Sequence, residues 1–179
     1  MKSPWMIRLL LFIIVLISAP VAYGQADATQ EKTRERLSAL LARIGPDINV
    51  EFKPSAKSQF VFVGMMREGL ANSESLEIIV TVTEDQTIRF RVFPKYKGDY
   101  INIDKAKNGA QLLRKLVQLN SSTFLFWGAD TAGDIFTGYT FTLESGFPDE
   151  ALKIVLTSIK NSDKFVGEMK SSIDGTGTP

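Results

Sequence analysis

LEIIVTVTEDQTIRFRVF, residues 76–93, is the stretch that decides the fold of this chain. On either side of a polar break, apolar residues alternate with polar ones, which predicts two half-buried strands. Cross-strand neighbours must share a face, so the same pattern predicts the register of a hairpin. The expected pairs are Val82 with Ile88, Val80 with Phe90 and Ile78 with Val92. This register leaves residues 84–86 as a three-residue loop.

Helices and further strands are predicted on both sides of the hairpin. Amphipathic spacing predicts a helix that ends at Gly45-Pro46, a second helix over about residues 105–119 and a last helix over 149–169. The expected buried stripe of the second helix is Ala106, Ala110, Leu113, Leu116 and Val117. Further strand-like runs lie at residues 48–52, 60–63, 123–127 and 135–143.

This order of elements predicts an α+β fold. Strands joined by hairpins form antiparallel sheets, and helices can then cover one face of the sheet. We therefore expect a single antiparallel β-sheet of about five strands with helices packed on one face, in the order α-β-β-β-α-β-β-α.

The first 24 residues have the pattern of a secretory signal peptide. Lys2 and Arg8 accompany an unbroken apolar run, LLLFIIVLI at residues 9–17. The small residues Ala22 and Gly24 suit cleavage after Gly24, and a cut after Ala26 is the alternative position. The run is shorter than the roughly 20 residues that span a bilayer. We expect a periplasmic or secreted protein with no stable membrane span after cleavage. The alternative is a membrane-surface component held by an uncleaved signal anchor.

The rest of the chain is predicted to form one domain. Residues 25–32 are polar and are expected to be a flexible lead-in, and residues 33–170 hold the α+β domain. Residues 171–179 are expected to be a disordered tail, because the chain from Asp174 onward has no apolar side chain to bury.

Composition excludes several kinds of site. The chain has no cysteine and no histidine, which removes disulfides, thiolate metal sites and histidine-dependent nucleophiles. Removal of residues 1–24 leaves 19 basic and 20 acidic residues, and such a near-neutral domain is not expected to bind nucleic acid. We expect no catalytic residue, no cofactor and no metal.

Acidic residues gather at two places that could carry chemistry. The segment DTAGD, residues 130–134, is predicted to be a hairpin turn, because it lacks the alternating oxygen ligands and distal glutamate of a calcium loop. Asp149 and Glu150 suit the first turn of a helix, where carboxylates offset the helix dipole. Paired carboxylates can act as general acid and base, so a histidine-independent hydrolase is the alternative function.

The C-terminal half resembles a known family. Residues 112–145 read LLRKLVQLNSSTFLFWGADTAGDIFTGYTFTLES, and an amphipathic helix follows. The order is a leucine-rich helix, a polar break, an aromatic strand, an acidic-glycine turn and a second strand. Over about residues 33–170 the chain resembles the YbjN family of bacterial sensory transduction regulators, which has a type III secretion chaperone-like fold. The resemblance implies that the protein acts by binding proteins, often as a dimer.

The aromatic strand carries the first part of a candidate interaction surface. In a strand, Phe124 and Phe126 share one face, and Leu125 and Trp127 share the other. A sheet covered on one side needs only one apolar face. The pair Leu125 and Trp127 therefore either lies under another element or marks an interaction surface.

Two arginines carry the second part. Arg89 and Arg91 alternate with the apolar residues of their strand and either solvate it or form an anion-binding or membrane-surface patch. We take Leu125, Trp127, Arg89 and Arg91 together as the candidate interaction surface. The predicted function is an exported, non-enzymatic protein-binding or chaperone-like module that acts through an apolar sheet surface, with an unidentified protein partner and a possible homodimer.

Overall fold

The structure is a computed structural model that describes residues 22–176. The predicted signal peptide lies outside these residues except for its last three, and residues 177–179 of the predicted tail also lie outside them. The helical elements are α2 (Ala22–Ile44), the 3-10 turn η1 (Gly45–Ile48), α3 (Gly109–Asn120), α4 (Asp149–Ser158), the 3-10 turn η2 (Ile159–Asn161) and α5 (Ser162–Asp174). The strands are β1 (Lys53–Ser55), β2 (Ser58–Met66), β3 (Ser75–Val82), β4 (Thr87–Tyr96), β5 (Asp99–Tyr100), β6 (Phe126–Ala129) and β7 (Ile135–Thr142).

Within the described residues the strands form one antiparallel sheet. Seven strands run in the order β1-β2-β3-β4-β7-β6, with β5 paired to β4. The α+β class and the single antiparallel sheet are confirmed, and the short strands β1 and β5 account for the larger number of strands. Residues 48–52 were predicted as a strand. In the structure they contain the last residue of η1 and the connection from η1 to β1.

The hairpin of β3 and β4 has the predicted register. Val82 pairs with Ile88, Val80 with Phe90 and Ile78 with Val92. Thr83 and Thr87 close the three-residue loop, with Thr83 N–H donating to the Thr87 carbonyl at 2.9 Å and their hydroxyls 2.8 Å apart. Gln86, the last loop residue, has a positive φ of 55°, the left-handed conformation that suits a loop of this length.

The register sorts the strand residues into two faces. One face, called the inner face, is lined by Phe62, Leu76, Ile78, Val80, Val82, Ile88, Phe90, Val92, Trp127, Ile135, Thr137, Tyr139 and Phe141. The opposite face, called the outer face, is lined by Val61, Val63, Met65, Glu77, Ile79, Thr81, Arg89, Arg91, Phe93, Lys95, Phe126, Phe136 and Thr140.

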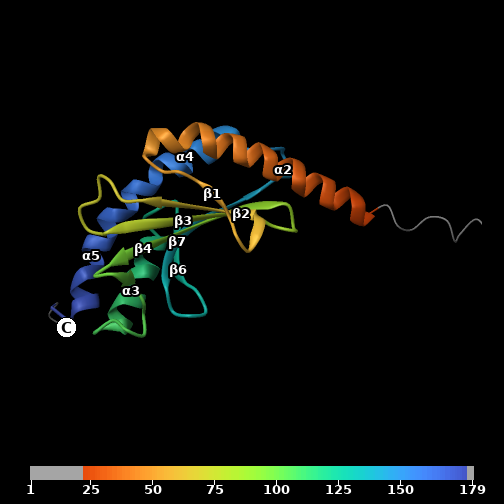
Figure 1. The fold of residues 1–179 in the computed structure, drawn as a ribbon. Coiled ribbons are helices and arrows are strands. Elements are labelled where there is room, and N and C mark those ends of the chain that lie inside the picture. The colour runs from red at the N-terminus through yellow and green to blue at the C-terminus, as the bar shows by residue number, and fades with distance from the viewer. Residues whose placement is uncertain (1–21, 177–179) are drawn as a thin grey trace, which may run out of the picture.

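Helices cover the inner face in two halves. Leu37 and Leu41 of α2 and Leu152 of α4 join one buried cluster with the inner side chains of β2, β3 and β4. Leu116 of α3 and Met169 of α5 join a second cluster with Trp127 and Ile135. Figure 1 shows α2 and α4 side by side above the sheet, with α5 descending beside it to α3. The prediction of helices on one face is confirmed.

Helix α2 begins earlier than expected. Residues 25–32, which were expected to be a flexible lead-in, form part of this helix. Ion pairing inside the helix contributes, since Arg34 contacts Glu31 one turn away at 2.5 Å. Thr33 is the first buried side chain described on this helix.

Helix α3 begins later and buries a different stripe than predicted. Asn102 holds residues 103–106 in a turn by accepting from the backbone N–H of Asp104 at 2.9 Å, and Asn108 caps the helix by accepting from Gln111 N–H at 3.2 Å. The buried residues are Leu112, Leu116 and Leu119. The predicted core residues Leu113 and Val117 are instead 51% and 65% exposed.

The predicted last helix is divided by the turn η2. The carboxylate of Asp163, at the start of α5, accepts hydrogen bonds from the backbone N–H groups of Ala71 at 2.7 Å and Ser73 at 2.7 Å and also from the Ser73 hydroxyl. This anchor fixes the loop between β2 and β3 against α5. Burial by itself raises the pKa of Asp163, but these hydrogen bonds outweigh it and hold the pKa below its usual value.

The end of α5 is tied to the sheet. Asp174 accepts hydrogen bonds from the Tyr96 hydroxyl at 2.8 Å and from Lys97 Nζ at 2.7 Å. The backbone carbonyl of Ile173 accepts from Lys107 N–H at 3.0 Å. The expectation of disorder from residue 171 onward is therefore wrong for residues 171–176.

Candidate interaction face and pocket

The outer face of the sheet is uncovered by helices. Neither buried cluster of the described residues contains an outer-face side chain. On β2 and β3 this face presents the apolar side chains of Val61, Val63, Met65 and Ile79, all of which are half-buried. Side chains of this kind usually lie under another element or against a partner.

A row of aromatic rings crosses the other half of the outer face. Phe126, Phe136, Phe93 and Tyr100 lie on successive strands β6, β7, β4 and β5, with neighbouring ring centroids 5.7, 5.5 and 5.8 Å apart. Gly138 makes room for this row, because a Cβ there would lie 3.1 Å from the Phe126 ring. Phe126, at the end of the row, is 40% exposed.

The two predicted arginines stand on this face. The guanidinium of Arg91 lies 4.7 Å from the centroid of the Phe136 ring, a cation–π contact, and its Nε is buried without a hydrogen-bond partner in residues 22–176. In the same described part of the chain, neither Arg89 nor Arg91 forms an ion pair. A buried, unsatisfied donor of a charged group costs free energy.

Other charges on the outer face are paired. Glu77 accepts from the Tyr100 hydroxyl at 2.6 Å and lies 3.4 Å from Lys95 Nζ. Burial, followed by the hydrogen bond to Glu77, raises the pKa of Tyr100 well above its usual value. The unpaired positive charge of this face therefore belongs to Arg89 and Arg91.

At both edges of the sheet, residues of the chain itself hinder pairing with a further strand. At β6, the Asn120 side chain accepts from Trp127 N–H at 2.5 Å and donates to the Trp127 carbonyl at 3.0 Å, as a neighbouring strand would. The Thr123 hydroxyl donates to the Leu125 carbonyl at 2.6 Å. At the other edge, β1 is three residues long and contains Pro54. Short strands and proline both discourage edge pairing.

Leu125 and Trp127 lie under other elements. Trp127 is 4% exposed and its ring meets Phe165 of α5 at 6.0 Å, while Leu125 is 7% exposed and belongs to the cluster under α2 and α4. The neighbouring Phe124 is 57% exposed. The prediction that the two pairs lie on opposite faces is therefore confirmed. The buried pair is Leu125 and Trp127, which belong to the candidate interaction surface.

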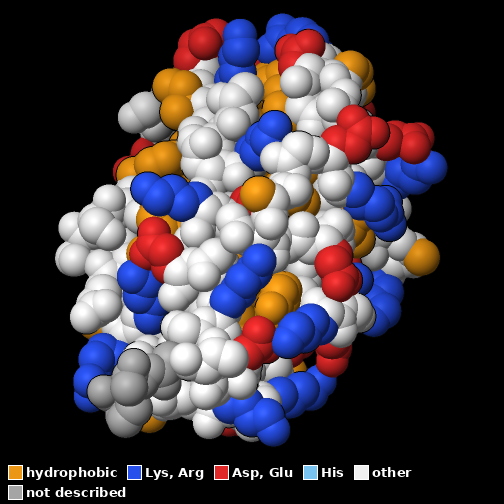
Figure 2. Space-filling view, turned by 90° about the vertical axis from the view of Figure 1, so that its left-hand side faces the viewer, with side chains coloured by type: hydrophobic (Ala, Val, Ile, Leu, Met, Phe, Trp, Pro, Cys, Tyr) orange, Lys and Arg blue, Asp and Glu red, His pale blue; other side chains and the backbone are white. Residues whose placement is uncertain are grey.

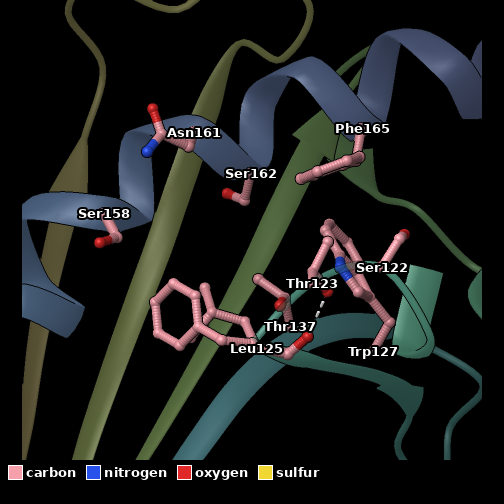
Figure 3. A pocket seen from close by; sticks show the side chains of 10 residues that line it. Ser122, Thr123, Leu125, Trp127, Thr137, Ser158, Asn161, Ser162 and Phe165 are labelled. Atoms are coloured by element: carbon pink, nitrogen blue, oxygen red, sulfur yellow. Dashed lines mark hydrogen bonds between the residues drawn. The ribbon is translucent and has the colours of Figure 1, made fainter.

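The same two residues line a pocket. It has a volume of about 250 Å³ and lies where the two buried clusters meet, between the α4–η2–α5 segment and the segment before β6. Figure 3 shows Ser158, Asn161 and Ser162 above the pocket, with Leu125, Thr137 and Trp127 below it and Phe165 at one side. The candidate interaction residues are thus divided: Arg89 and Arg91 lie on the outer face, and Leu125 and Trp127 line a pocket on the inner side.

Three of the four carboxylates considered for chemistry have structural partners. Asp130 accepts from the N–H groups of Ala132 and Asp134 at 2.9 and 3.0 Å, and Gly133 has a φ of 81°, which confirms the predicted hairpin turn. Asp134 accepts from Asn102 Nδ2 at 2.7 Å, and Asp149 binds Arg36. The described residues include no group of three or more acidic side chains that could hold a metal ion.

Charges on the helix side are mixed in sign. Figure 2, seen from the side on which α5 lies, shows basic and acidic side chains interspersed, with hydrophobic side chains in small separate patches. In the part of the chain from residue 22 to 176, no helix has both the length and the apolar character needed to span a bilayer.

Comparison with known proteins finds a similarity between this chain and a solved structure. No protein-family model matches the chain, and no curated protein matches it. Among solved structures, the chain is similar to the crystal structure of YbjN from E. coli, with 12% identity, a TM-score of 0.49, and coverage of 77% of this chain and 91% of that one. This score and identity are too low to assign a family, so membership of the YbjN family stays a prediction.

Proposed function

We propose that this chain is a non-enzymatic, protein-binding module that contacts its partner through the outer face of the sheet. The observation that carries the proposal is this uncovered face, on which half-buried apolar side chains adjoin two arginines that have no ion pair in the described residues. Apolar area next to desolvated arginine is typical of protein interfaces.

The closed edges support binding by the face. The Asn120 side chain forms hydrogen bonds with the backbone N–H and carbonyl of Trp127 at the β6 edge. At the other edge, Pro54 lies in the short strand β1. Addition of a strand from another chain would have to displace these contacts. A partner that packs on the face displaces none of them.

The charge of the face specifies the chemistry of the partner. Glu77 is already paired with Lys95, whereas neither Arg89 nor Arg91 forms an ion pair within the described residues. A partner segment that combines apolar side chains with carboxylates would cover Val63 and Ile79 and satisfy the two guanidinium groups. The proposed partner is therefore an acidic, apolar segment of a protein.

Binding of model peptides tests this chemistry. A labelled peptide that alternates glutamate with leucine should bind the full chain more tightly than one that alternates lysine with leucine, as measured by fluorescence anisotropy. In the variant Arg89→Ala/Arg91→Ala, affinity for the glutamate peptide should fall about tenfold or more, because two charge pairs are lost.

The matched control removes two arginines from the helices. Arg43→Ala/Arg114→Ala changes the net charge by the same amount at exposed positions of α2 and α3. It should bind the glutamate peptide as the unmodified chain does. Equal binding of the two peptides, or an equal loss in both double variants, would contradict the proposal.

Self-association through the same face is the second candidate. It is favoured by the half-buried apolar side chains of Val61, Val63 and Ile79 on the outer face, which can pack against the same residues of a second copy. Light scattering should then show a mass that rises with concentration in the unmodified chain and stays constant in Ile79→Glu. A constant mass in both removes this candidate and leaves the acidic partner.

We also propose that the chain is exported and that its signal is cleaved. The pattern of residues 1–24 supports this, and a cut after Gly24 would spare the part of α2 that packs, since Thr33 is its first described buried side chain. N-terminal sequencing of protein from the periplasmic fraction should begin at Gln25. A mature chain that begins at Met1 would support the anchored alternative.

A further inference from the structure

The pocket between β6 and α5 is held open by its own surroundings. The Thr123 hydroxyl lies 2.9 Å from the Leu119 carbonyl and 2.6 Å from the Leu125 carbonyl. Asn120 fixes Trp127 by two hydrogen bonds. The segment on one side of the pocket therefore cannot collapse onto the helices on the other side without breaking these bonds.

The polar groups of the lining are almost all satisfied internally. Thr137 donates to the Phe126 carbonyl at 3.0 Å, Ser158 to the Ile154 carbonyl at 2.5 Å and Ser162 to the Ile159 carbonyl at 2.6 Å. Ser122 likewise lies within hydrogen-bond distance of the Leu119 carbonyl. These hydroxyls have no proton left to donate to a ligand.

Trp127 supplies a donor that the protein leaves unused. The residue as a whole is 4% exposed, and its indole N–H donates to no group within the described residues. Figure 3 shows the indole nitrogen on the side of the ring that faces Thr123. An N–H that no protein group accepts is available to a ligand acceptor in the pocket, and the low polarity of the lining would strengthen that hydrogen bond.

The lining also sets the charge and the size of an occupant. No charged side chain is among the described residues that line the pocket. Transfer of an ion into such a site is strongly unfavourable unless it is paired. A cavity of about 150 Å³ is enough to hold benzene, so the 250 Å³ here suits one ring with a small substituent.

We propose that this pocket binds a neutral, ring-sized small molecule that carries one hydrogen-bond acceptor, such as an aryl ketone. The ring packs against Leu125 and Phe165, and the acceptor receives the indole N–H of Trp127. This site is separate from the outer face and stands independently of the proposed partner.

Nuclear magnetic resonance of the ¹⁵N-labelled full chain tests the proposal with acetophenone as the probe. The chain contains two tryptophans, and Trp5→Phe assigns the indole signal of Trp127. Acetophenone should shift that indole proton saturably downfield. Ethylbenzene, which lacks the acceptor, should bind at least about threefold more weakly and cause no downfield shift. Benzoate and benzylammonium should bind at least about tenfold more weakly, because the pocket pairs neither charge.

Two helix variants distinguish the pocket from other sites. Ser158→Phe places a ring in the pocket and should abolish the acetophenone shift. Thr157→Phe is the matched control, since Thr157 is exposed on the same helix, makes the same kind of hydroxyl-to-carbonyl bond and does not line the pocket. Thr157→Phe should bind acetophenone as the unmodified chain does, and unchanged melting temperatures would show that both variants fold.

Three results would overturn the assignment. The first is the absence of a saturable shift of the Trp127 indole signal, and the second is a shift that persists in Ser158→Phe. The third is tighter binding of N-acetyl-phenylalaninamide than of acetophenone, which would make the occupant a side chain of a protein partner. A pocket for one ring predicts weaker binding of the amide, because its peptide groups would remain outside.

Discussion

At the scale of single residues, Trp127 distinguishes a core role from a surface role. Its ring packs on Phe165 and belongs to the cluster under α3 and α5. Trp127→Ser should therefore lower the free energy of unfolding by about 3–5 kcal/mol, the usual cost of removing a large buried aromatic side chain. Urea denaturation of the full chain measures this loss.

Phe126 provides the matched control for Trp127. It is the adjacent residue, points to the outer face and is 40% exposed. Phe126→Ser should cost only about 1 kcal/mol, because much less apolar area returns to water. Similar losses in the two variants would mean that Trp127 is not in the core.

Asp163 makes stability depend on pH in a defined direction. Its hydrogen bonds to the loop between β2 and β3 lower its pKa in the folded state below the usual value of 3.8. A lowered pKa gives a stabilisation that is complete above the unfolded pKa and is lost as the pH falls through the folded pKa. Asp163→Asn should thus cost about 2–3 kcal/mol near neutral pH, and the difference should shrink below about pH 4.

Urea denaturation over a pH series checks this expectation. Asp85→Asn, in the exposed hairpin loop, is the control and should leave stability unchanged at each pH. A difference between Asp163→Asn and the unmodified chain that stays constant from neutral to acidic pH would show that the carboxylate charge is not what holds the loop.

Leu125 and Trp127 also show what residue patterns cannot determine. Alternation correctly placed them on one face and Phe124 and Phe126 on the other. It gave no means to decide which face the helices cover, because both sets are apolar. That choice is made by Phe165 and the rest of α5, which lie far along the chain.

At the scale of elements, the β6 edge depends on Asn120. Asn120→Ala removes both hydrogen bonds to Trp127 and should lower the free energy of unfolding by about 1–3 kcal/mol. Hydrogen exchange at the Trp127 amide should become faster, since that amide loses its acceptor. Gln118→Ala, at an exposed position of the same helix, is the control. Unchanged exchange at Trp127 in Asn120→Ala would contradict the role given to Asn120.

Elements also differ in how well the sequence predicts them. The hairpin of β3 and β4 was predicted to the residue because its alternation is strict and its partners must share a face. Helix α3 was not, because its leucines and valine occur on both sides of the helix. Packing against α5 and β6 selects Leu112, Leu116 and Leu119 and leaves Val117 exposed.

At the scale of the whole molecule, the arrangement is one-sided. Helices cover the inner face, Asn120 and Pro54 protect the two edges, and the outer face is left with apolar side chains beside Arg89 and Arg91. The sequence predicted the α+β class and a sheet covered on one face. It could not predict the pocket, because its walls come from separate segments, within residues 122–127 and 158–165 and at Thr137, that meet only after folding.

Site-specific photo-crosslinking in cells tests the central claim most directly. With p-benzoyl-phenylalanine in place of Ile79 on the outer face, the full chain should form one discrete adduct with another protein, and Arg89→Ala/Arg91→Ala should abolish it. The same photoreactive residue in place of Ala39, exposed on α2, should form no adduct. The account is contradicted if the Ile79 position gives no adduct, or if the Ala39 position gives the same one.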